Sequence, residues 1–310
     1  MADKNKKMLV IQKIMKQPET LTVFSVATNM PLVECNEESF NDQVYIFENE
    51  DALKEFAKSY ADKKIPLRGV KYAAADRMKF FTTLLCINVD EIVYIDALGK
   101  FILKVSDIVK KNDFSKLPKE QRPIENPSLQ LSGIYFAQEA SRPVPNEEKT
   151  NLKELEEELA VNMVKSTYIV AVDFLEGPES ETEKMKNAKF RLPLLKTKND
   201  DIYQPIFTDN IELAKYNKEN KCKAIAVPFA NLEKLLVPQS KGFMLNPNGY
   251  HLLMPKELLQ GLKARFGVES PKPAQDAAND NAQAGFDGNI KLGGPEDEIN
   301  PSDGDSLSVN

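Results

Sequence analysis

The stretch Val44-Tyr45-Ile46-Phe47-Glu48-Asn49-Glu50 decides the fold class, because it joins a short apolar strand to the start of a helix. Asn49 is a residue type that often caps helices. After it, apolar residues recur with helical spacing and share one face: Leu53, Phe56, Ala57 and Tyr60. A strand that passes directly into an amphipathic helix is typical of a mixed α+β domain.

The pattern on both sides of this stretch predicts a complete module in residues 1–110. It has the order β-β-β-α-β-α-β-β-α and belongs to the α+β class. A short helix precedes it and ends at Pro18. The expected elements are strands at 21–27, 30–34, 44–47 and 67–72, helices after Asn49 and around 78–85, a hairpin of 92–95 with 101–105, and a short helix from Ser106.

The same order of elements recurs in residues 151–268, which predicts two divergent repeats of one module. Val23-Phe24-Ser25-Val26 aligns with Ile169-Val170-Ala171-Val172. Chance matching of apolar strands is the alternative, but order, element type and turn glycines all agree. The further aligned pairs are Pro31 with Pro193, Phe47 with Phe207, Leu53 with Leu213, Val70 with Val227, Gly99 with Gly249, and Leu103 with Leu253.

Two segments lie outside the repeats. Residues 111–150 contain five prolines and read as a linker. Within the linker, residues 129–136 (Leu-Gln-Leu-Ser-Gly-Ile-Tyr-Phe) are too apolar to stay in solvent, and we expect them to dock on one module as an extra strand. Residues 269–310 form an acidic tail that is poor in apolar residues, and we expect it to be disordered.

Charge and cysteine usage exclude several classes of protein. The tail carries most of the acidic excess in a chain of 41 basic and 47 acidic residues, so the remainder is nearly neutral and argues against nucleic-acid binding. Cys35, Cys86 and Cys222 are far apart in the sequence, which favours reduced thiols and a cytoplasmic protein. No apolar run approaches the roughly 20 residues that span a membrane, and the amino terminus lacks a signal-peptide core.

Four segments of the second repeat carry a family resemblance. They are Lys189-Phe190-Arg191-Leu192-Pro193-Leu194-Leu195, Gln204-Pro205-Ile206-Phe207-Thr208-Asp209, Ala226-Val227-Pro228-Phe229, and Gly242-Phe243-Met244-Leu245-Asn246-Pro247-Asn248-Gly249. Together they resemble the amino-terminal domain of the SseB family, named for enhanced serine sensitivity.

The first repeat keeps part of this pattern, in Met30-Pro31-Leu32-Val33-Glu34-Cys35 and Asp42-Gln43-Val44-Tyr45-Ile46-Phe47-Glu48. It departs at Asp96-Ala97-Leu98-Gly99, where the family has an Asn-Pro turn. The resemblance implies tandem SseB-like α+β domains in a bacterial cytoplasmic protein. It supplies no catalytic residues to carry over.

The turn Asn246-Pro247-Asn248-Gly249 is the one candidate binding site. Pro247 presets φ, and Asn248 and Gly249 tolerate positive φ, so a structural hairpin turn also accounts for every residue type. The sequence therefore leaves a binding turn and a structural turn open.

Other candidate sites are weaker. His251 is the only histidine, and no motif places a nucleophile and an orienting acid beside it, so we expect no catalytic residue. We also expect no metal site and no cofactor. Four aromatic residues could form a contact surface, although core packing fits each of them better: Tyr45, Tyr60, Tyr203 and Phe243.

Duplication without catalytic chemistry favours a non-enzymatic binding or scaffold protein that recognises another protein through its paired domains. A small-molecule sensor with a pocket between the domains is the second hypothesis, because domain interfaces often form clefts. A hydrolase or transferase is the third.

Overall fold

The computed structural model describes residues 2–118, 121–174, 190–268 and 306–307. The chain divides into two compact units, one formed by residues 1–159 with 301–310 and the other by residues 160–300. Both units are mixed α+β, as the sequence predicts. In the described part of the chain, no helix is both long enough and apolar enough to cross a lipid bilayer.

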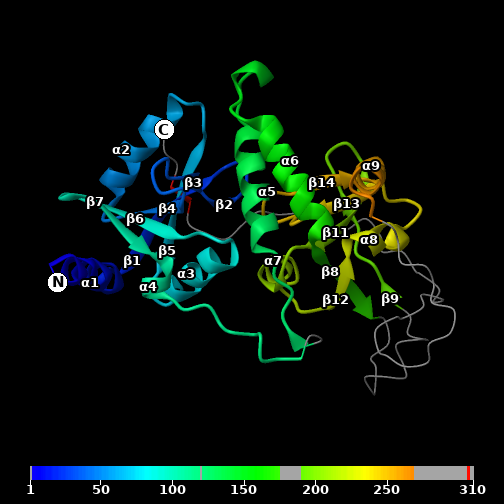
Figure 1. Ribbon diagram of the computed structural model, residues 1–310, viewed down its shortest axis with the longest axis horizontal. Helices are drawn as coiled ribbons and strands as arrows, with labels where there is room; N and C mark the ends of the chain where they lie inside the picture. Colours follow the sequence, from blue (N-terminus) through cyan, green and yellow to red (C-terminus); the bar gives the residue numbers. More distant parts are fainter. Residues whose placement is uncertain (1, 119–120, 175–189, 269–305, 308–310) are drawn as a thin grey trace. The chain divides into compact units, whose positions relative to one another are not determined.

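Unit 1 is a twisted sheet flanked by helices (Figure 1). Its strands are β1 (Glu19–Ser25), β2 (Met30–Pro31), β3 (Glu34–Cys35), β4 (Asp42–Phe47), β5 (Leu67–Ala73), β6 (Glu91–Asp96), β7 (Gly99–Lys104) and β15 (Ser306–Leu307). Its helices are α1 (Ala2–Lys16), α2 (Glu50–Ala61), α3 (Arg77–Cys86), α4 (Val105–Ile108) and α5 (Pro127–Ala140), followed by the 3-10 turn η2 (Asn146–Glu148).

The strand order of this sheet is β15-β5-β1-β4-β6-β7, with β2 on β1 and β3 on β4. Among the described strands of this sheet only the β4–β6 pair is parallel, and it lies inside the sheet. The helix-containing connection between these two strands, through α2, β5 and α3, is what a parallel pair requires.

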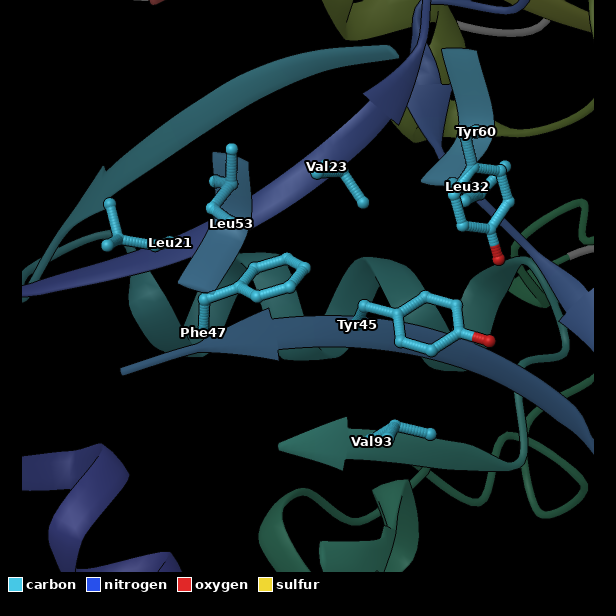
Figure 2. Close-up of a cluster of buried hydrophobic side chains, with 8 residues drawn as sticks. All are labelled: Leu21, Val23, Leu32, Tyr45, Phe47, Leu53, Tyr60 and Val93. Atoms are coloured by element: carbon cyan, nitrogen blue, oxygen red, sulfur yellow. The ribbon is translucent and has the colours of Figure 1, made fainter. Parts of the chain in front are cut away.

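One face of the sheet packs against α2. Asn49 caps this helix as predicted, because its Oδ1 accepts a hydrogen bond of 3.0 Å from the backbone N–H of Ala52. Figure 2 shows the buried cluster beneath the helix, which consists of Leu21, Val23, Leu32, Tyr45, Phe47, Leu53, Tyr60 and Val93. Burying side chains of this size stabilises the fold by about 1.5 to 3 kcal/mol each.

The opposite face carries α1, α3 and α4 (Figure 1). Ile14 of α1 and Phe81 of α3 are fully buried there. Arg77 at the start of α3 is also buried, and its guanidinium donates to the backbone oxygens of Met15 (2.6 Å) and Gln17 and to Thr20 Oγ1 (2.7 Å). This one side chain therefore joins the end of α1 to the start of β1.

The predicted extra strand in residues 129–136 is wrong, because this segment lies within helix α5. Asn126 precedes the helix and Pro127 occupies its first turn. A proline is tolerated there because the N–H groups of the first turn have no acceptor within the helix. The buried positions recur with helical spacing and include residues that are not apolar: Leu129, Gln130, Ser132, Gly133, Ile134 and Ala137. Helix α5, which contains the segment, does dock on a module as expected, through contacts of Tyr135 with Asp42 and of Gln138 with Val33.

Helix α6 (Leu152–Lys165) begins in unit 1 and leads into unit 2. The strands of unit 2 are β8 (Thr167–Phe174), β9 (Phe190–Arg191), β10 (Leu195–Lys196), β11 (Ile202–Phe207), β12 (Cys222–Pro228), β13 (Gly242–Leu245) and β14 (Leu252–Pro255). Its further helices are α7 (Asn210–Tyr216), α8 (Phe229–Leu232), the 3-10 turn η3 (Glu233–Leu235) and α9 (Lys256–Phe266).

The sheet of unit 2 repeats the topology of unit 1. Its order is β12-β8-β11-β13-β14, with β9 on β8 and β10 on β11. The only parallel pair among its described strands is β11 with β13, the counterpart of β4 with β6. Each unit therefore builds the same sheet from strands in the same chain order.

The strand pairing corrects part of the predicted alignment between the repeats. Leu21 faces Phe47 and Ile169 faces Phe207, so Ile169 corresponds to Leu21 and not to Val23. In the last hairpin, Phe101 pairs with Tyr94 and Leu252 with Leu245, which makes Met254 the counterpart of Leu103. Burial agrees, because Leu103 and Met254 are buried whereas Leu253 is 41% exposed.

The predicted disordered tail, residues 269–310, lies outside the described residues except for Ser306–Leu307. Those two residues form β15, which pairs antiparallel with β5.

Candidate functional site

The predicted turn at Asn246 lies at a distinctive place in unit 2. Strands β11 and β13 are parallel, so their carboxyl ends meet at one edge of the sheet. Thr208 and Asp209 follow β11 directly, and Asn246 follows β13. In open α/β sheets this is the edge where ligands bind most often, which makes these residues the candidate site.

Asn246 is fully buried and holds the two strand ends together. Its Oδ1 accepts a hydrogen bond from the backbone N–H of Thr208 (3.0 Å), and its Nδ2 donates to Thr208 Oγ1 (3.0 Å). Its φ of 49° places it in the left-handed region, which asparagine adopts more readily than most residues. Asn246 therefore acts as a structural clamp between β11 and β13.

Asp209 starts the helix that follows β11. Its Oδ1 accepts hydrogen bonds from the backbone N–H groups of Ile211 (2.8 Å) and Glu212 (3.0 Å), which makes it the N-cap of α7. Its other oxygen accepts from Thr208 Oγ1 at 2.9 Å. Both oxygens of this carboxylate are thus engaged by the fold.

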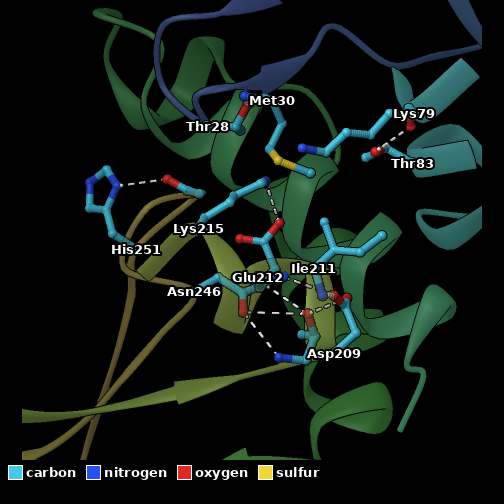
Figure 3. Close-up of polar contacts among 12 residues, drawn as sticks. Thr28, Met30, Lys79, Thr83, Asp209, Ile211, Glu212, Lys215, Asn246 and His251 are labelled. Atoms are coloured by element: carbon cyan, nitrogen blue, oxygen red, sulfur yellow. Dashed lines mark hydrogen bonds and ion pairs between the residues drawn. The ribbon is translucent and has the colours of Figure 1, made fainter. Parts of the chain in front are cut away.

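Glu212 lies beside this network (Figure 3), and its carboxylate is close to Gly249. The Glu212 side chain is buried, and its Oε1 pairs with Lys215 Nζ at 2.5 Å. A Cβ atom at residue 249 would lie 3.0 Å from Glu212 Oε2, so a side chain here would require the Glu212 carboxylate to shift. Burial, together with nearby Glu212, raises the pKa of Tyr250 well above its usual value.

His251 is exposed and lies apart from Asp209 and Glu212 (Figure 3). Its Nδ1 is 3.2 Å from the carbonyl oxygen of Gly249. Within the described residues, no group of three or more His, Cys, Asp or Glu side chains has a geometry that could hold a metal ion. The three cysteines form no disulfide.

The corresponding edge of unit 1 has different chemistry. Glu48 follows β4 and Asp96 ends β6, and both carboxylates bind the Lys13 ammonium group of α1, at 2.6 and 2.8 Å. Hydrogen bonds to Asp96 and Glu48 raise the pKa of Lys13, and the bond from Lys13 lowers the pKa of Glu48. In unit 1 the Lys13 side chain therefore occupies the edge at the carboxyl ends of β4 and β6.

The four aromatic residues considered as a contact surface are all in the core, as their types favoured. Tyr45, Tyr60, Tyr203 and Phe243 are each less than 10% exposed. The sequence did not reveal that the hydroxyl groups of Tyr45 and Tyr60 both donate to Glu34 Oε2. Burial and the Glu34 carboxylate raise the pKa of both tyrosines, so they remain neutral hydrogen-bond donors.

A neighbouring carboxylate, Asp42, contacts helix α5. Its Oδ1 accepts a hydrogen bond of 2.5 Å from the hydroxyl of Tyr135. Burial raises the pKa of Asp42 despite this bond, and the charge of Asp90 adds to the effect. Burial and the Asp42 carboxylate likewise raise the pKa of Tyr135.

Comparison with known proteins identifies one domain of the chain. Residues 148–260 match the family model described as SseB protein N-terminal domain, so the chain contains one SseB N-terminal domain, in the region of the second repeat. No curated protein matches the chain. A solved structure, Tic22 from Plasmodium falciparum, is similar at 14% identity over 84% of this chain and 99% of that chain, and its TM-score of 0.16 is too low to support any argument.

Proposed function

We propose that the chain is a non-enzymatic SseB-like binding protein that recognises another protein through its two units. Unit 1 would then be a second, diverged copy of the domain matched in unit 2. Two linked binding units raise the effective concentration of the second contact once the first has formed.

The observation that carries this proposal is the way polar groups are used at the carboxyl edges of the two parallel strand pairs. In unit 2, Asn246 and Asp209 are buried and make hydrogen bonds that hold the strand ends and cap α7. In unit 1, Lys13 forms ion pairs with both Glu48 and Asp96. A catalytic site at these edges would need an acid, base or nucleophile facing a substrate, whereas these groups support the fold.

A small-molecule sensor is the second candidate function. A hollow in unit 1 can be compared in size with typical small-molecule pockets. The hollow measures about 260 Å³ and is lined mostly by polar residues, among them Asn41, Asp90 and Glu91. Small-molecule pockets usually measure about 300 to 1,000 Å³ and are mainly apolar. The hollow is smaller and more polar than such pockets, so it does not support the sensor.

Affinity capture tests the proposal. The full chain, tagged and expressed in the cells that carry it, should recover one protein in a stoichiometric amount. An unrelated protein with the same tag and a similarly acidic tail serves as the control. Repeated recovery of nothing above this control would contradict protein recognition.

Two further measurements separate the other candidate functions. A metabolite that raises the thermal midpoint of the full chain, with no protein partner recovered, would support the sensor. Loss of a detected hydrolase or transferase activity in His251→Ala would support an enzyme.

A further inference from the structure

The loop between β3 and β4 in unit 1 presents an aromatic side chain to solvent. Phe40 is 78% exposed, although phenylalanine is normally buried. Single exposed apolar residues are common, so exposure alone proves little. The conformation of the loop backbone is the further evidence that the exposure of Phe40 matters.

The loop is held in one conformation by its own hydrogen bonds. Asn36 Oδ1 accepts from the backbone N–H groups of Glu38 and Ser39, each at 2.9 Å. The N–H of Phe40 donates to the Asn36 carbonyl at 2.8 Å, and the N–H of Asn36 donates to the Asn41 carbonyl at 2.9 Å. The backbone at Phe40 is therefore held in place before any partner arrives.

Phe40 also has an unfavourable backbone conformation. Its φ of 57° lies in the left-handed region, which glycine and asparagine adopt readily and bulky residues rarely do. Because the ring is exposed, no burial within the fold offsets this strain. A strained residue that the fold does not need is a reason to look for a function outside the fold.

The surroundings of Phe40 are acidic. Glu37 and Glu38 are exposed on the same loop, and Asn41 lines the hollow together with Asp90, Glu91 and one basic residue, Lys104, so the carboxylates outnumber the lysine. Glu91 is buried and accepts hydrogen bonds of 2.7 Å from the side-chain amides of Asn41 and Gln43. An apolar tip beside negative charge complements a partner with an apolar pocket and a basic rim.

We propose that Phe40 is the anchor of a protein-binding surface formed by residues 37–41 and the hollow beside them. The partner supplies an apolar pocket for the phenyl ring and a lysine or arginine that reaches Glu37, Glu38 or the Asp90 wall of the hollow. This surface rests on the proposed function, since it assigns the contact by which the chain recognises its protein partner. The carboxylates disfavour an anionic membrane as the occupant, because like charges repel.

The variant Phe40→Asn separates binding from folding. Asparagine suits the left-handed conformation, so the thermal midpoint of the full chain should stay the same or rise. Capture of the protein recovered by the wild-type chain should fall about tenfold or more, the usual effect of removing an aromatic anchor.

The matched control is Leu98→Asn. Leu98 is 85% exposed in the turn after β6, whereas the hollow lies at the other end of β6 beside Glu91. Capture by this variant should equal that of the wild-type chain. A photoreactive phenylalanine at position 40 should cross-link to a partner peptide in which apolar residues adjoin lysine or arginine, and one at position 98 should not.

Charge provides an independent test. The double variant Glu37→Gln, Glu38→Gln should weaken capture several-fold at low salt and flatten its salt dependence, because screening acts on the charges that it removes.

Three results would overturn the inference. Undiminished capture by Phe40→Asn removes Phe40 from the contact while leaving protein recognition intact. A fall in the thermal midpoint of this variant shows that the fold needs the phenyl ring. Failure of the wild-type chain to capture any partner contradicts both the proposed function and this surface.

Discussion

At the scale of single residues, Asn246 makes contacts that its turn motif does not reveal. The turn Asn246-Pro247-Asn248-Gly249 lies where one parallel strand ends beside the end of another. Its role could not be read from the motif, because the partner, Thr208, is distant in sequence and its contact exists only once β11 and β13 pair. The motif therefore predicts where the turn lies, but it does not predict which of its side chains are free to bind.

Replacing Asn246 with alanine should destabilise unit 2 by about 2 to 3 kcal/mol. The change leaves the buried N–H of Thr208 without an acceptor and puts alanine at positive φ. Urea unfolding of the full chain measures the loss, and Pro247→Ala, which removes no side-chain hydrogen bond, is the control. A loss below about 0.5 kcal/mol would contradict the clamp.

Tyr72 should make unit 1 sensitive to alkali. Burial raises its pKa to about 12, although the positive charge of Arg68 acts to lower it. A tyrosine in an unfolded chain titrates near about 10. The protonated form is the one that the fold favours. The stability it contributes is therefore complete below about pH 10 and is lost as the pH rises toward about 12, with about 1 kcal/mol gone by pH 11.

The matched control is Tyr72→Phe, which keeps the ring that stacks on Phe80 at 4.7 Å. The difference between the near-ultraviolet titrations of the wild type and this variant isolates Tyr72. Ionisation of Tyr72 near pH 10 in the folded chain would contradict the burial of its hydroxyl.

At the scale of elements, α5 marks the limit of reading periodicity from apolar residues alone. Leu129-Gln130-Leu131-Ser132 alternates as a strand would, but the buried set includes Gln130, Ser132 and Gly133, which do not count as apolar. Asn126 and Pro127 were the available start signal for a helix. The strands and helices of the repeats were easier to predict from the sequence, because their apolar residues alone mark the buried face.

Gln138 fastens α5 to the module. Its amide accepts from the N–H of Val33 (3.1 Å) and donates to the Val33 carbonyl (2.9 Å), and Val33 is fully buried. Gln138→Ala should therefore cost about 1 to 3 kcal/mol and speed hydrogen exchange across α5. Gln121→Ala, at an exposed position, should change neither; unchanged exchange in the Gln138 variant would show that α5 docks by other contacts.

Arg77 and Lys13 both hold α1, but with unequal strength. Arg77 is buried with backbone and hydroxyl acceptors, so Arg77→Met should cost about 2 to 4 kcal/mol and expose the amides of α1 to exchange. The Lys13 side chain is 40% exposed, and Lys13→Met should cost about 1 kcal/mol or less. Equal losses in the two variants would show that the ion pairs of Lys13 hold the helix as strongly as the Arg77 guanidinium does.

At the scale of the whole molecule, the sequence was sufficient for the fold class and the repeated order of elements. It was not sufficient for register, because apolar strands align almost equally well when shifted by one or two residues. The shift matters physically: in β14 it decides between buried Met254 and exposed Leu253 as the counterpart of Leu103. Backbone pairing in the sheet, which composition does not encode, settles the choice.

An experimental structure of the full chain tests most directly whether one sheet has been built twice. We predict that β5-β1-β4-β6-β7 and β12-β8-β11-β13-β14 superimpose strand for strand, with Tyr45 beside Val93 and Pro205 beside Met244 in the two parallel pairs. A different strand order in either sheet, or an antiparallel arrangement of β11 and β13, would contradict the account.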